Sequence, residues 1–95
     1  MLDDADITPA LEGLPGWSRR GNALVREYVV EGGFSDAVAF VARVAAAADE
    51  ADHHPDVAIS WNRVTLTWST HSAGGITDKD LAMAGRSDAI AGGQG

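Results

Sequence analysis

Residues 57–70 read VAISWNRVTLTWST, two runs that alternate apolar and polar side chains around a tight turn at Asn62-Arg63. Alternation with a period of two places every second side chain on one face of a strand. The segment therefore predicts a β-hairpin with one apolar face, and other elements must cover that face. A sheet with helices packed against it is the fold that this hairpin indicates.

A long helix is expected before the hairpin, from Ser35 to about Ala51. Ser35 can cap its N-terminus, and apolar residues then recur at helical spacing. These apolar positions are Ala37, Phe40, Val41, Val44, Ala45 and Ala48. Pro55 disfavours the helical conformation for the residue before it, so the helix must end near His53 and His54.

Another hairpin is expected before the long helix. Residues 17–20 and 23–30 flank Gly21-Asn22, a dipeptide typical of hairpin turns. Residues 8–13 run from a capping threonine through a proline to a glycine, so they predict a single helical turn with Pro9 at its first helical position.

A second helix is expected after the hairpin of residues 57–70. Thr77 and Asp80 resemble a capping box, and apolar residues follow at Leu81, Ala82, Ala84 and Ile90. The expected order is strand, strand, helix, strand, strand, helix. We therefore predict an α+β fold, with a four-stranded antiparallel sheet and helices packed on one face.

The composition narrows the class of protein. Ninety-five residues suffice for one domain, which we expect to span residues 1–95 with a frayed tail at 92–95. The absence of cysteine excludes disulfides, thiolate metal sites and a thiol nucleophile. A formal charge of −7 argues against nucleic acid and anionic membranes as partners. An acidic N-terminus and the lack of a membrane-length apolar run predict a soluble, cytoplasmic protein.

All three histidines of the chain lie between residues 53 and 71. Because an unperturbed imidazole titrates near neutral pH, this grouping suggests acid/base chemistry. The alternation places His71 on the polar face of its strand or at the strand end, so it is not expected in the core. A ligand near the end of the long helix could contact His53, His54 and His71 together.

At this point a family resemblance becomes specific. The segment DEADHHP at 49–55, the hairpin, and STHSAGGITDKDL at 69–81 resemble the signature of the pterin-4a-carbinolamine dehydratases. That signature has an acidic residue, three intervening residues and His-His-Pro or His-Asn-Pro. A Thr-His, a glycine and a Thr/Ser-x-x-Asp helix start follow downstream. The resemblance covers nearly the whole chain. Val57 departs from it, because the best-known members have an aromatic residue there, and this difference concerns the pocket wall rather than the histidines.

The resemblance implies removal of water from a 4a-hydroxytetrahydropterin to give the quinonoid dihydropterin, in recycling of a pterin after an aromatic amino-acid hydroxylase has used it. It implies catalysis by His53, His54 and His71 without a metal or other cofactor, and a homodimer or homotetramer. Which histidine is the acid and which the base stays open. The substrate-binding residues implied are these three histidines with Pro55, Thr70, Ser72, Ala73, Asp49, Asp52 and Asp80.

Simpler interpretations stand beside these. Asp80 is most simply a helix cap with Thr77, and the acidic residues of 49–52 are by default a solvated helix end, although Asp49 can hydrogen-bond an imidazole. The three tryptophans are expected in the core or in subunit contacts. Zinc is a weaker alternative, because neighbouring helical residues point about 100° apart and His53 and His54 would converge only outside the helix.

A non-catalytic role is the alternative function. The resemblance extends to an animal protein that also serves as a dimerisation cofactor of a homeodomain transcription factor, and to assembly factors. A binding or dimerisation protein with a protein partner is therefore the second hypothesis. Retention of all three histidines favours catalysis, because a scaffold alone has no need of them.

Overall fold

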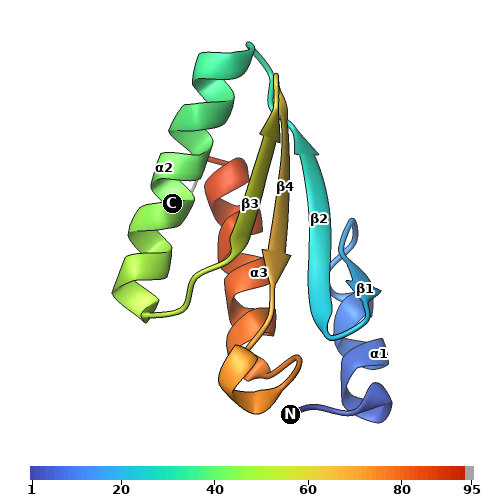
Figure 1. The fold of residues 1–95 in the computed structure, drawn as a ribbon. Coiled ribbons are helices and arrows are strands. Elements are labelled where there is room, and N and C mark those ends of the chain that lie inside the picture. The colour runs from blue at the N-terminus through green and yellow to red at the C-terminus, as the bar shows by residue number, and fades with distance from the viewer. Residues whose placement is uncertain (94–95) are drawn as a thin grey trace.

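The computed structural model describes residues 1–93. Figure 1 shows a four-stranded sheet with α2 and α3 on one face, and α1 beside β1 at one edge. The elements are α1 (Asp4–Glu12), β1 (Ser18–Arg20), β2 (Ala23–Val29), α2 (Phe34–Ala51), β3 (Asp56–Ser60), β4 (Arg63–Trp68), the 3-10 turn η1 (His71–Ala73) and α3 (Asp78–Ala91). The predicted fold class and element order are confirmed. The frayed tail expected at 92–95 includes residues 94 and 95, which lie outside the described part of the chain.

The strand order is β1-β2-β4-β3, and each neighbouring pair is antiparallel. The register places apolar residues of adjacent strands on the same face, with Leu24 opposite Trp68 and Tyr28 opposite Val64. Helices α2 and α3 cover this face, so the core lies between the sheet and the helices. None of the helices in residues 1–93 is long and apolar enough to cross a membrane.

Helix α2 starts one residue earlier than predicted, and the capping role of Ser35 was wrong. Gly33 is the N-cap, at φ 132°, and no side-chain hydrogen bond caps this end. Only glycine adopts such a conformation without strain, so the glycine rather than the serine sets the start of the helix. On the buried face, Ala47 occupies the place expected for Ala45, which is exposed.

Helix α1 is longer than the single turn expected at residues 8–13. Asp3 caps its N-terminus in a capping box with Asp6, so the helix begins at Asp4. Pro9 therefore lies inside the helix rather than at its first position. The prediction took Thr8 as the cap, because proline is common at the first helical position. The capping box that Asp3 forms with Asp6 determines the start instead, and Asp3 lies five residues before Thr8.

The turn between β3 and β4 consists of Trp61-Asn62 rather than Asn62-Arg63, since Ser60 pairs with Arg63. Trp61 has φ 51° and is 68% exposed. A positive φ is rare for so bulky a residue. Strand β3 lies at the sheet edge and Val57 on it is 42% exposed, so the helices cover this strand only in part.

Candidate functional site

His53 directly follows the left-handed residue that ends α2. Asp52 is the C-cap at φ 50°, and the backbone N–H of His53 donates to the carbonyl of Ala48 at 3.1 Å. The imidazole is partly buried, with Nε2 2.6 Å from Asp80 Oδ1. Its ring also stacks on Trp68, with centroids 5.6 Å apart and planes at 23°. The ring is thus held in its plane by a carboxylate and on one face by an indole.

Asp80 is fully buried in the first turn of α3, and its two oxygens have different partners. Oδ2 accepts hydrogen bonds from the Thr77 backbone N–H at 2.9 Å and from Thr70 Oγ1 at 2.8 Å, while Oδ1 contacts His53. The helix-cap interpretation of Asp80 is confirmed, but it is incomplete. The same carboxylate joins the helix, the end of β4 and an imidazole.

His71 lies on a short loop that is closed at its base. The backbone N–H of Thr70 donates to the carbonyl of Gly75 at 3.0 Å, and that of Gly75 to Thr70 at 3.3 Å. His71, Ser72 and Ala73 form an exposed 3-10 turn between these two anchors. Because buried Thr70 also contacts Asp80, the His71 loop is anchored to the group that contacts His53.

His54 forms a second histidine–carboxylate pair, and both of its members are exposed. Its Nε2 lies 2.9 Å from Oδ1 of Asp49, one turn back on α2. The sequence left open whether Asp49 is a solvated helix end or hydrogen-bonds an imidazole, and its partner in the structure is His54. Pro55 is partly buried at the start of the following strand. Asp52 is exposed and, within residues 1–93, forms no hydrogen bond to a histidine, so the structure leaves it outside this constellation.

The arrangement suits proton transfer. In the described part of the chain, no group of three or more His, Asp or Glu residues is placed to hold a metal ion. Instead, the Nε2 atoms of His53 and His54 each face a different carboxylate. A carboxylate that accepts from one imidazole nitrogen orients the ring and favours a proton on that nitrogen, which leaves the other nitrogen free to exchange protons.

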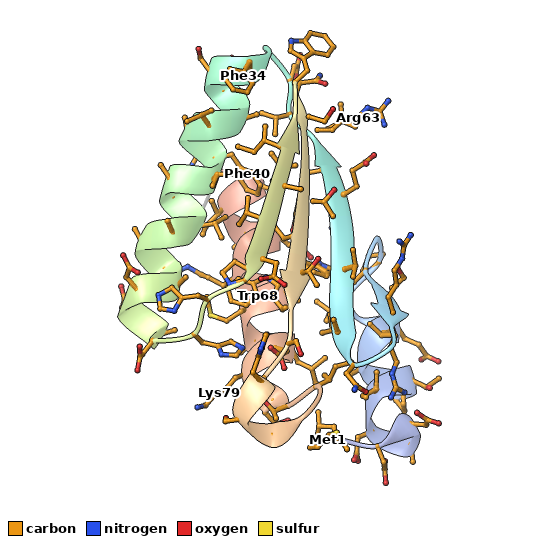
Figure 2. All side chains as sticks on the ribbon, in the orientation of Figure 1. Met1, Phe34, Phe40, Arg63, Trp68 and Lys79 are labelled. Carbon is orange, nitrogen blue, oxygen red and sulfur yellow. The ribbon has the colours of Figure 1, made fainter. Side chains whose placement is uncertain are left out.

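Sequence reasoning missed the role of Trp68. It was expected in the core or in a subunit contact, and it is fully buried, yet its indole also supports His53. Figure 2 shows Trp68 near the end of β4 that leads toward α3, the part of the molecule where Lys79 also lies. The alternation of residues 64–70 assigns Trp68 to the buried face, but no local pattern indicates which residue packs against it.

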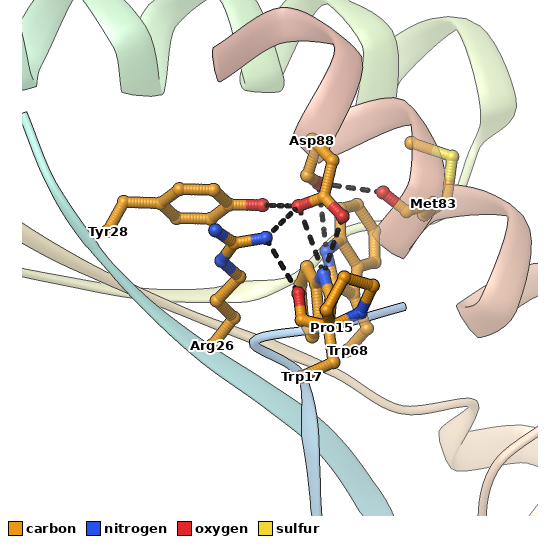
Figure 3. A network of polar contacts seen from close by, with 8 residues as sticks. Pro15, Trp17, Arg26, Tyr28, Trp68, Met83 and Asp88 are labelled. Atoms are coloured by element: carbon orange, nitrogen blue, oxygen red, sulfur yellow. Dashed lines mark hydrogen bonds and ion pairs between the residues drawn. The ribbon is translucent and has the colours of Figure 1, made fainter. Parts of the chain in front are cut away.

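A second polar cluster lies farther along α3 (Figure 3). The carboxylate of Asp88 accepts from Trp17 Nε1 at 3.0 and 3.1 Å, from Arg26 Nη1 at 2.9 Å and from the Tyr28 hydroxyl. Burial raises the pKa of the Tyr28 phenol, and the Asp88 carboxylate raises it further. This cluster connects β2 and the segment before β1 to α3, so we assign it a role in stability.

A pocket of about 410 Å³ is also distant from the histidines. It lies between the end of β2, α2 and the end of α3, and its lining includes Tyr28, Phe40 and Arg43. No histidine lines it, and its charged residues are exposed. The two histidine–carboxylate pairs therefore lie outside this pocket.

Comparison with known proteins points to one family. Residues 1–90 match the family model described as pterin 4 alpha carbinolamine dehydratase. A protein of Thermomicrobium roseum, provisionally named pterin-4-alpha-carbinolamine dehydratase, is 57% identical over 83 residues, which are 87% of this chain and 88% of its own length. A protein of Mycobacteroides abscessus with the same provisional name is 52% identical over 84 residues, 88% of each chain.

Two solved structures share the fold. A protein described as a transcriptional coactivator/pterin dehydratase, from Brucella melitensis, superposes with a TM-score of 0.90 at 37% identity, over 95% of this chain and 97% of its own. A pterin dehydratase-like protein identified as a RuBisCO assembly factor in the alpha-carboxysome gives a TM-score of 0.64 at 25% identity, over 80% and 87% of the two chains. The fold is thus shared by a protein described as a pterin dehydratase and by one described as an assembly factor.

Proposed function

This chain belongs to the pterin-4-alpha-carbinolamine dehydratase family, and on that basis we propose that it eliminates water from a 4a-hydroxytetrahydropterin to give the quinonoid dihydropterin. The contact between His53 Nε2 and buried Asp80 carries the proposal, because it gives a chain with all three family histidines an oriented proton-transfer group. The reaction would take place in the cytoplasm, where it would recycle the pterin that an aromatic amino-acid hydroxylase has oxidised.

The elimination needs two proton transfers. The bond between C4a and the hydroxyl oxygen breaks, and that oxygen takes a proton from a general acid and leaves as water. The ring nitrogen beside C4a gives its proton to a general base, and the electron pair of that N–H bond forms the new carbon–nitrogen double bond. Each positioned group accelerates such a step about 10²–10⁴-fold. Imidazoles perform both tasks near neutral pH.

We assign the base to His53. Asp80 Oδ1 accepts from Nε2–H of this ring, so the lone pair is on Nδ1, which has no hydrogen-bond partner among the described residues. When Nδ1 takes the proton, the adjacent carboxylate stabilises the imidazolium that forms. Asp80 therefore acts as a positioning residue for His53.

His54 and His71 are the two candidates for the general acid. Both are exposed and can exchange protons with water between turnovers. His54 has a carboxylate partner in Asp49, whereas His71 lies on the loop closed by Thr70 and Gly75. We propose that the histidine that is not the acid helps to hold the substrate, and that Pro55 and the backbone of residues 70, 72 and 73 shape the pocket.

We propose that the protein forms a homodimer or a homotetramer. Phe34 and Val38, 55% and 43% exposed, lie one turn apart on α2, and half-exposed Val57 lies on the edge strand β3. An unpaired strand edge next to exposed apolar side chains favours association with another chain. Light scattering at micromolar concentration tests this, and a monomer there contradicts it.

Binding or assembly without catalysis is the second candidate. It is favoured by the fold shared with a protein identified as a RuBisCO assembly factor. The two candidates differ in one measurable respect, because a scaffold has no effect on the rate at which a carbinolamine loses water.

The test is the rate of 4a-hydroxytetrahydropterin dehydration, followed by absorbance, with and without the purified protein. We expect strong acceleration by the wild-type protein, a loss of 10²-fold or more in His53→Ala, and large losses in His54→Ala and His71→Ala. The variant Ser35→Ala, exposed on α2 and away from the histidines, is the matched control and should retain full activity. Inactivity of the folded wild-type protein would overturn the enzyme assignment, and loss of activity with a chelator would overturn catalysis by histidines alone.

A further inference from the structure

We infer that Trp68 and Ser87 form a positioning pair that fixes the face and orientation of the His53 imidazole. This inference deepens the proposed function, since it assigns to that reaction two residues outside the histidine motif. Trp68 would act through His53, and Ser87 through Trp68. Neither side chain needs to contact the pterin, because both are buried.

A hydrogen bond joins Trp68 to Ser87. The indole Nε1–H of Trp68 donates to Ser87 Oγ at 3.2 Å, and the hydroxyl of Ser87 donates to the carbonyl of Met83 at 2.7 Å. The hydroxyl proton is thus used within α3, which leaves an oxygen lone pair for the indole. Trp68 is 0% and Ser87 1% exposed, so water does not compete for either contact.

This pairing is more demanding than core filling requires. Two apolar residues of the same shape would fill the space with no polar group to satisfy, and replacing both partners of a buried hydrogen bond in this way is nearly neutral for stability. Here the sequence has instead a donor on β4 and an acceptor on α3. A directional bond at the edge of the indole restricts rotation of the whole ring, which a purely apolar contact does not.

The ring of Trp68 in turn stacks on the imidazole of His53. The two rings lie at 23° with centroids 5.6 Å apart, so the indole presents its face to the imidazole. The negative face of an indole attracts a cation, and the contact therefore strengthens when His53 becomes an imidazolium. Asp80 holds the same ring in its plane at Nε2. The two supports restrain different rotations of one imidazole and leave Nδ1 available.

The expected kinetic effect follows from positioning. A reacting group that is misplaced by about 1 Å can lose up to 10²-fold in rate. We expect Ser87→Ala and Trp68→Phe to lower kcat about tenfold with KM changed by less than about twofold. Trp68→Phe keeps an aromatic face but removes the N–H together with part of the ring, whereas Ser87→Ala removes only the acceptor. Ser87→Ala therefore tests the directional bond in particular.

Proton and nitrogen NMR of the folded protein supplies a readout that does not depend on turnover. In the wild-type protein, the ring current of Trp68 should shift the His53 ring protons upfield. In Ser87→Ala those signals should move or broaden, because the indole below them is no longer held. Trp68→Phe changes the ring current itself, so that variant is judged by its kcat. Tyr28→Phe is the matched control, since it also removes a partly buried side-chain contact to α3, and that contact shares no hydrogen bond with Trp68 or Ser87.

The inference is supported if Ser87→Ala shifts the His53 signals and lowers kcat, and Trp68→Phe lowers kcat, while Tyr28→Phe changes neither. It is overturned if Ser87→Ala folds with wild-type His53 signals, if Trp68→Phe folds with wild-type kcat, or if Tyr28→Phe has equal effects. If one variant fails to fold by circular dichroism, the other decides. Should the wild-type protein prove inactive while the His53 signals respond as expected, the proposed function fails and the positioning pair stands.

Discussion

A single N–H group of Trp17 lies within hydrogen-bonding distance of both carboxylate oxygens of Asp88, at 3.0 and 3.1 Å. The two residues are 71 positions apart, so this contact joins the segment before β1 to the second half of α3. Arg26 and Tyr28 donate to the same carboxylate from β2 (Figure 3). Three parts of the structure, the segment before β1, strand β2 and helix α3, therefore depend on one acidic side chain.

Asp88→Ala should lower the free energy of unfolding by about 3 kcal/mol, because partly buried donors lose their acceptor and Arg26 loses its counter-charge. Urea unfolding followed by tryptophan fluorescence measures this. Asp78→Ala, an exposed acidic residue of the same helix, should cost much less. Equal effects of the two substitutions would refute a special role for the Asp88 cluster.

Tyr28 should make stability fall at alkaline pH. Its pKa is raised in the folded protein above the ordinary value of 10.0, so above about pH 10 the unfolded chain loses the phenol proton while the folded protein retains it. The unfolded state is then favoured as pH rises, and below that pH the full contribution is present. Urea unfolding from pH 8 to 11 should show this decline. Tyr28→Phe, which removes the only tyrosine, should flatten it.

Asp80→Asn should impair catalysis more than folding. The amide oxygen can still accept from the Thr77 backbone, but an amide N–H₂ facing His53 no longer favours a proton on Nε2. We expect kcat to fall by about 10²–10⁴-fold, the range in which a misplaced imidazole proton acts. Nitrogen NMR of His53 should report a change of tautomer. Asp78→Asn controls for the loss of one negative charge, and unchanged activity in Asp80→Asn would contradict the positioning of His53 by Asp80.

Asp52→Gly should stabilise the protein by about 0.5–1 kcal/mol, because glycine adopts the left-handed conformation at the end of α2 without steric cost. Thermal unfolding measures the gain. The same variant also tests the expectation that Asp52 binds substrate. We expect unchanged kcat and KM, since this exposed side chain lies outside the histidine contacts. A raised KM would restore Asp52 to the site.

Local patterns account for what could be predicted from the sequence. In the hairpin of residues 57–70 and in the long helix, the alternation of apolar and polar residues continues over many positions. Local sequence therefore determines the type of these elements, with little influence from tertiary contacts. Single-residue features were less secure. The turn at Trp61 was displaced by one position because the sequence has a bulky side chain where turn geometry favours glycine or asparagine.

Long-range pairings explain the rest. Asp80 was recognised as a helix cap from its neighbour Thr77, but its bond to His53 joins residues 27 positions apart. Trp68 with Ser87 and Trp17 with Asp88 are likewise invisible to any periodicity, because each forms only when distant elements meet. The histidine motif indicates the candidate site, and Asp49 and Asp80 could be named as candidates from the sequence. The pairing of each carboxylate with one histidine, and the stacking of Trp68 on His53, could not be predicted.

The double use of Asp80 bears on how relatives of this protein should be interpreted. A relative that lost catalytic activity but kept the fold would still need the Asp80 carboxylate to cap α3 and to hydrogen-bond Thr70. Selection for folding alone is therefore enough to retain this aspartate. The exposed imidazoles of His54 and His71 have no comparable structural duty within residues 1–93. Their loss, rather than the loss of Asp80, would be the earlier mark of a lineage that had turned from catalysis to assembly.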